Sequence, residues 1–77
     1  MTLADFIQKI EESIDTLPKE VLKGETKYRE LPEWSSMHAL IIIAMVDLEY
    51  EVALGGEEIR NSETISDLFN LVQSRKN

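Results

Sequence analysis

The sequence contains no cysteine and few basic residues, and both shortages exclude classes of function. Without cysteine there is no disulfide framework, no thiolate metal site and no cysteine nucleophile. Eight lysines and arginines stand against fifteen acidic residues, which gives a net charge of −7. Nucleic-acid phosphates and anionic membrane surfaces attract basic side chains, so this balance argues against both as partners. The same charge can steer the chain towards basic patches on proteins, or only keep it dissolved.

The sequence also lacks a long apolar run and any alternating β pattern. The longest apolar run, Ala39–Val46, covers 8 residues, far fewer than the roughly 20 that span a bilayer, so we expect no membrane insertion. Met1–Asp5 has no basic n-region of a signal peptide, and we expect a cytoplasmic monomer. No metal-ligand cluster, calcium-loop pattern or glycine-rich phosphate loop is present. The 77 residues are 43% hydrophobic, enough for one folded domain over residues 1–77.

Apolar residues at helical spacing predict a first helix. Thr2 and Asp5 resemble a capping-box start, and Pro18 is expected to end the helix. A long connection follows over residues 19–34, with a short turn of helix expected near Glu20–Lys23. The residues expected to bury the helix face are Leu3, Phe6, Ile7, Ile10, Ile14 and Leu17, and those expected to pin the connection are Val21, Leu22, Tyr28, Leu31 and Trp34.

Three more helices are predicted after this connection. The second should begin at Ser35 or Ser36 and end near Glu51, before the break at Leu54-Gly55-Gly56. The third should cover Glu57–Arg60 and be closed by Asn61, and the fourth should begin at Thr64 with Asp67 as its capping partner. The predicted fold is therefore all-α: a small four-helix bundle of three longer helices and one short third helix, with a long loop between the first and second.

The second helix is apolar nearly all the way round. The three isoleucines Ile41–Ile43 alone sweep about 200° of arc, whereas a surface helix needs an apolar stripe of only about 100°. Two interpretations stand side by side. The face of Ile41, Ala44 and Leu48 is exposed for a partner or a second copy, or the long loop covers it. A short chain with two other long helices can hardly wrap this helix completely.

The head and tail of this helix resemble the acyl and peptidyl carrier protein family. The resemblance is carried by Trp34-Ser35-Ser36-Met37 at the head and Asp47-Leu48-Glu49-Tyr50 at the end. Glu57-Glu58-Ile59 and Thr64-Ile65-Ser66-Asp67-Leu68 are similar to the family's short third helix and the start of its fourth. The order and spacing of elements match over nearly the whole chain, although the three-residue motif alone is weakly specific.

The resemblance implies a carrier with a 4′-phosphopantetheine arm attached through a phosphodiester to Ser36. A serine at a helix N-terminus is exposed, and a phosphate there meets free N–H groups. Ser35 is expected to cap the helix. No nucleophile–base pair is expected, because His38 lies two residues from Ser36 and such positions do not face each other; His38 is expected on the surface. The implied partners are a phosphopantetheinyl transferase and acyl-transferring or acyl-modifying enzymes. We do not expect the chain itself to be an enzyme.

Two sets of residues follow as expectations from this resemblance. Acyl-pocket candidates are Ile42, Val46, Ile59, Leu68 and Phe69; the expected partner-binding residues are Met37, His38, Ile41, Ala44, Leu48, Glu57 and Glu58. The cargo is not specified, since fatty-acid biosynthesis and polyketide, amino-acid and surface-sugar acylation all use such carriers.

The sequence departs from the family at two positions of the motif. Ser35 stands where the family has an aspartate that helps to engage the transferase, and Met37 stands where it has leucine. Leucine to methionine conserves volume. The loss of the aspartate supports an alternative: an unmodified, carrier-like interaction domain that binds partners through the apolar face of the second helix. Without this aspartate, recognition by the transferase loses about 0.2–1 kcal/mol if the contact is an exposed ion pair. It loses about 2–5 kcal/mol if the contact is desolvated.

Overall fold

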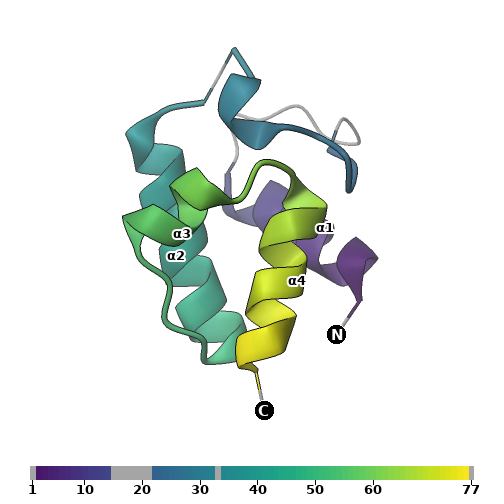
Figure 1. Cartoon of the computed structure of the whole chain (residues 1–77), viewed down its shortest axis with the longest axis vertical. Coiled ribbons are helices and arrows are strands. Elements are labelled where there is room, and N and C mark those ends of the chain that lie inside the picture. The colour runs from purple at the N-terminus through teal and green to yellow at the C-terminus, as the bar shows by residue number, and fades with distance from the viewer. Residues whose placement is uncertain (1, 15–21, 33, 77) are drawn as a thin grey trace.

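The computed structural model describes residues 2–14, 22–32 and 34–76. Within these residues the chain forms four α-helices and one 3-10 turn, without a strand. The helices are α1 (Leu3–Ser13), α2 (Ser36–Tyr50), α3 (Gly56–Asn61) and α4 (Ile65–Arg75), and the 3-10 turn is η1 (Tyr28–Glu30). The all-α expectation and the order of long and short helices are confirmed (Figure 1).

Two threonines begin helices where the sequence predicts them. The Thr2 hydroxyl accepts the N–H of Asp5 at 3.1 Å and so caps α1. Thr64 caps α4 in the same way, accepting the N–H of Asp67 at 3.1 Å, and its own N–H donates to the Asp67 carboxylate at 3.2 Å. This reciprocal pair is a capping box, with aspartate in the place of the more common glutamate.

α1 ends earlier than predicted, at Ser13 rather than at Pro18. The next residue, Ile14, adopts an extended conformation, and its side chain is 2% exposed. Serine, a β-branched isoleucine, aspartate and threonine follow one another over residues 13–16, and all four types are weak helix formers. Leu17 and Pro18 lie outside the described residues.

The connection before α2 contains its helical turn in a different place from the one predicted. The turn is η1, and Leu22 and Lys23 are not helical; Glu20 and Val21 lie outside the described residues. The connection is fixed to the start of α4, because the N–H groups of Ile65 and Ser66 donate to the carbonyls of Thr26 and Gly24. A Cβ on Gly24 would collide with the ends of the Ser66 and Leu3 side chains, which would have to turn away, so glycine favours this close approach.

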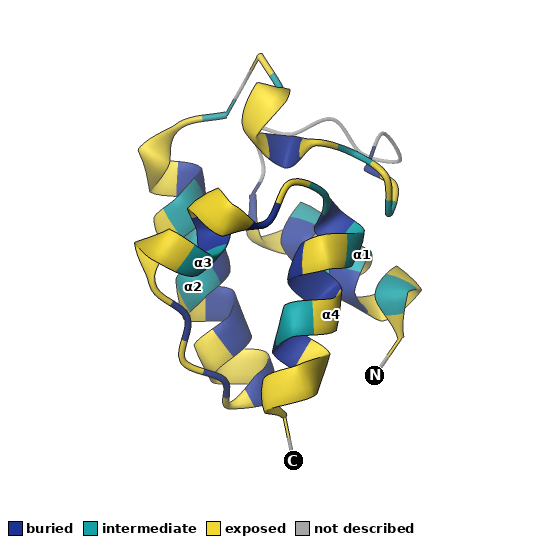
Figure 2. Cartoon of the chain, in the orientation of Figure 1, coloured by how far each residue is buried: buried dark blue, intermediate teal, exposed yellow. Residues whose placement is uncertain are grey.

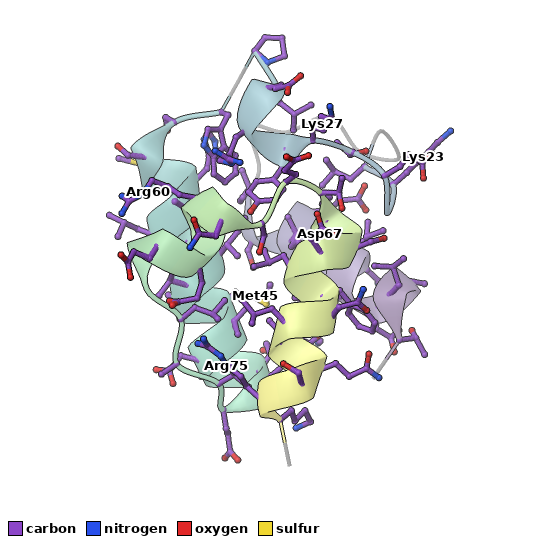
Figure 3. All side chains as sticks on the ribbon, in the orientation of Figure 1. Lys23, Lys27, Met45, Arg60, Asp67 and Arg75 are labelled. Atoms are coloured by element: carbon purple, nitrogen blue, oxygen red, sulfur yellow. The ribbon has the colours of Figure 1, made fainter. Side chains whose placement is uncertain are left out.

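The hydrophobic core lies where α1 packs against both α2 and α4. Phe6 is fully buried at its centre, with its ring 5.9 Å from that of Tyr50 and 5.6 Å from that of Phe69. Met45 points from α2 into the space between α2 and α4 (Figure 3). α3 packs against α2 and adds Ile59 to this core, while the surface groove between α2 and α3 lies at the edge of the core.

Candidate functional site

Ser35 and Ser36 lie at the head of α2, and Ser35 is the capping residue, as predicted. Ser35 is the N-cap, with extended backbone angles, and Ser36 is the first helical residue and is exposed. The Ser36 hydroxyl forms no hydrogen bond within the part of the chain that the structure describes. It is therefore a free hydroxyl on an open surface, which another protein can reach.

His38 does not lie on the surface, and that prediction is wrong. Its side chain is 9% exposed. The imidazole Nδ1 accepts the backbone N–H of Ser35 at 2.9 Å and lies 3.0 Å from the Ser35 hydroxyl. His38 thus occupies the third helical position, from which glutamate or glutamine usually reaches back in a capping box. The ring turns towards the N-cap, because an acceptor there satisfies a backbone N–H that the helix leaves without a partner.

An aromatic stack holds this cap against the rest of the fold. The His38 ring stacks on Trp34 with 5.7 Å between centroids, and Trp34 meets Tyr28 edge-on at 5.1 Å. The Tyr28 hydroxyl donates to the carbonyls of Ile59 and Ser62, at 2.6 and 2.8 Å. These contacts fix η1 and the head of α2, which are close in the sequence, to the end of α3, which is about 30 residues further along the chain.

A serine–imidazole contact therefore exists, although the sequence predicts no nucleophile–base pair. It joins His38 to Ser35, three residues away, rather than to Ser36. Because the Ser35 N–H donates to Nδ1, that nitrogen carries no proton and its lone pair is already engaged. The contact has the geometry of a helix cap rather than of an activated nucleophile.

A surface groove of about 410 Å³ opens beside Ser36, between the first turns of α2, the short helix α3 and η1. Its polar members are Ser36 and two arginines, Arg29 from η1 and Arg60 from α3. The remainder of its lining is mostly apolar: Trp34, Ala39, Leu40, Ile43, Gly56 and Ile59. Sequence reasoning missed Arg29 and Arg60, because their position beside Ser36 depends on how η1 and α3 pack against α2.

The predicted acyl-pocket residues are all buried, but they do not surround a ready cavity. Ile42 and Leu68 line an internal cavity of about 10 Å³ beneath Trp34, which is room for about one water molecule. Ile59 lines the surface groove instead, and Val46 and Phe69 line neither space. A carried chain would have to displace core side chains to enter beside Ile42 and Leu68.

The exposed apolar face of α2 is confirmed in large part. We call it the α2 stripe. Leu48 is 80%, Met37 68% and Leu40 65% exposed, whereas Ile41 is half-buried. Figure 2 shows exposed residues along the outer edge of α2, away from α4. The described part of the long connection, residues 22–32, leaves the side chain of Leu48 exposed. The members of the α2 stripe are Met37, Leu40, Ile41, Ala44 and Leu48.

The two glutamates expected at the rim of a partner surface differ in their surroundings. Glu57 is exposed. Glu58 is half-buried; it accepts the N–H of Gly55 at the start of α3 and pairs with Arg75 at 3.7 Å. Glu58 therefore already has a role inside the fold, as a cap and as a link from α3 to α4.

No group of three or more histidine, cysteine or acidic side chains within the described residues is arranged to hold a metal ion. Nor does any described helix combine the length and the apolar character needed to cross a bilayer. Neither a family model, nor a curated protein, nor a solved structure matches this chain.

Proposed function

We propose that this chain is a carrier protein that holds an acyl or related group as a thioester on a 4′-phosphopantetheine arm attached to Ser36. The observation that supports this most is the free, exposed Ser36 hydroxyl at the first position of α2. The capping contact at the head of the helix joins Ser35 to His38 and does not involve Ser36, so modification of Ser36 leaves this contact intact. The groove beside Ser36 offers two guanidinium groups that suit a phosphodiester.

The chemistry of attachment divides between this chain and a transferase. The Ser36 Oγ forms a bond to the phosphorus nearest the pantetheine of coenzyme A, the pyrophosphate bond breaks, and adenosine 3′,5′-bisphosphate leaves. The hydroxyl proton passes to a base of the transferase, since the only imidazole of this chain is engaged with Ser35. The arm, once attached, supplies the thiol that a chain without cysteine lacks. Tethering then keeps its cargo at high local concentration for partner enzymes.

In vitro loading tests this function. We would incubate the chain with coenzyme A and a phosphopantetheinyl transferase of broad specificity, and follow the intact mass. We expect the wild type and Ser35→Ala to gain one phosphopantetheine and Ser36→Ala to gain none. Ser35→Asp keeps a good N-cap residue and restores the acid typical of the family, so we expect it to load faster. If neither the wild type nor Ser35→Asp gains mass, the chain is not a carrier.

A second function is favoured by the α2 stripe: an interaction domain that is never modified. Met37, Leu40 and Leu48 are strongly exposed along one helix, and apolar side chains of this exposure suit contact with another protein. The loading experiment separates the two functions, because only the carrier depends on Ser36.

A further inference from the structure

The groove beside Ser36 brings together two cations in a strongly acidic chain. Arg29 and Arg60 come from separate elements and line the same groove. Lys9 pairs with Glu49 at 2.9 Å and Arg75 with Glu58, whereas neither Arg29 nor Arg60 forms an ion pair with a carboxylate in residues 2–14, 22–32 and 34–76. Arg29 also interacts with the Tyr28 side chain. Because no carboxylate of the described residues is paired with either arginine, the positive charge of both can still attract an anion that enters the groove.

The rest of the groove suits a flexible chain with apolar stretches. Trp34 is half-buried at one side, and Leu40 and Ile43 lie one turn apart on α2. Leu40 is 65% exposed, so a ligand that covers it removes apolar surface from water. Cations beside an apolar, aromatic lining thus favour an anionic ligand with a flexible tail that has apolar stretches, and Ser36 lines the same groove.

We propose that Arg29 and Arg60 hold the phosphodiester of the arm on Ser36, and that Trp34, Leu40 and Ile43 receive its pantetheine chain. This inference rests on the proposed function. Guanidinium groups present several donors in a plane and match phosphate oxygens closely. Because the arm is tethered, its effective concentration at the groove is on the order of millimolar, so even a weak contact populates the docked position. The carrier then rests with its arm in the groove and releases the arm to partner enzymes.

Nuclear magnetic resonance of the apo and phosphopantetheine-loaded protein tests the docked arm. We expect loading to shift the Nε–H signals of Arg29 and Arg60, the indole N–H of Trp34 and the amide of Ile43. Arg29→Gln with Arg60→Gln should remove the Trp34 and Ile43 shifts. Shifts confined to Ser36 and its chain neighbours would overturn the inference, even in a protein whose mass proves that Ser36 is loaded.

Titration of the apo protein with free 4′-phosphopantetheine keeps the two proposals distinguishable. Trp34 is the only tryptophan, so its fluorescence reports on the groove. We expect saturable binding that weakens about tenfold in the double arginine variant and about tenfold for pantetheine, which lacks the phosphate. If the chain cannot be loaded but shows this binding, the carrier function fails and the groove remains an anion site. A phosphate-independent response would overturn the role of the arginines.

A charge-matched variant controls for the loss of two positive charges. Lys23→Gln with Lys27→Gln makes the same change of net charge on exposed side chains that do not line the groove. Figure 3 shows both lysines on the connection before α2, away from Arg60. We expect this variant to bind like the wild type. Equal weakening by both double variants would show that only the overall charge matters, and would also overturn the inference.

Discussion

The two core tyrosines present opposite situations for a hydroxyl group. The Tyr28 hydroxyl donates to two carbonyls, whereas the buried Tyr50 hydroxyl has no hydrogen-bond partner among the described residues. We expect Tyr28→Phe to lower the free energy of unfolding by about 1–3 kcal/mol, because buried carbonyls lose their donor. Tyr50→Phe should be neutral or stabilising. Urea unfolding of both variants measures this, and an equal loss in both would contradict the assigned contacts.

The same tyrosine predicts how stability changes in alkaline solution. Burial raises the pKa of Tyr28 from about 10 to about 12, because the phenolate is poorly solvated inside the fold. Between these values the unfolded chain releases a proton that the folded chain keeps, so stability falls as the pH rises from 10 to 12. In Tyr28→Phe this fall should be shallower. Urea midpoints at neutral and alkaline pH would reveal it, and parallel curves for the two proteins would disprove it.

At the scale of single residues, the sequence predicted the residues that cap helices better than it predicted which side chains are buried. Thr2, Thr64 and Ser35 follow local rules, since a cap depends on residues three positions apart. His38 was misplaced because its burial depends on Trp34, and the position of Trp34 depends in turn on Tyr28. Such contacts join segments whose spacing carries no periodic signal.

At the scale of elements, α2 is the feature that folding alone explains least. Its inner residues complete the core, whereas the α2 stripe faces outward. We expect Ile42→Ala, at 1% exposure, to cost about 2–5 kcal/mol. Leu48→Ala, at 80% exposure, should change stability by less than about 0.5 kcal/mol. Thermal unfolding of the two variants provides the comparison. A large loss in Leu48→Ala would mean that the stripe is covered in solution.

Element boundaries show where periodicity stops being informative. The helical spacing of apolar residues continues through Ile14, yet Ile14 is buried in an extended segment rather than in α1. An apolar residue reaches the core from either conformation, so spacing alone cannot mark the end of a helix. The groove beside Ser36 was beyond sequence reasoning for a related reason: Arg29 and Arg60 are 31 positions apart and meet only through packing.

At the scale of the whole molecule, the net charge of −7 opposes folding through mutual repulsion. Raising the ionic strength from about 0.01 M to about 0.15 M shortens the Debye length from about 30 Å to about 8 Å. We expect the melting temperature to rise by a few degrees, equivalent to less than about 1 kcal/mol. The exposed pair of Lys9 and Glu49 opposes this only weakly. A melting temperature that falls with salt would mean that attractive pairs dominate.

The carrier function depends on whether Ser36 carries an arm in the cell. The most direct measurement is the intact mass of the chain isolated from its native source, followed by fragmentation to locate any added group. We predict a chain heavier by one phosphopantetheine, with or without an acyl cargo, attached at Ser36. A chain with the mass of its sequence alone under every growth condition would contradict the proposal and leave the interaction domain as the better account.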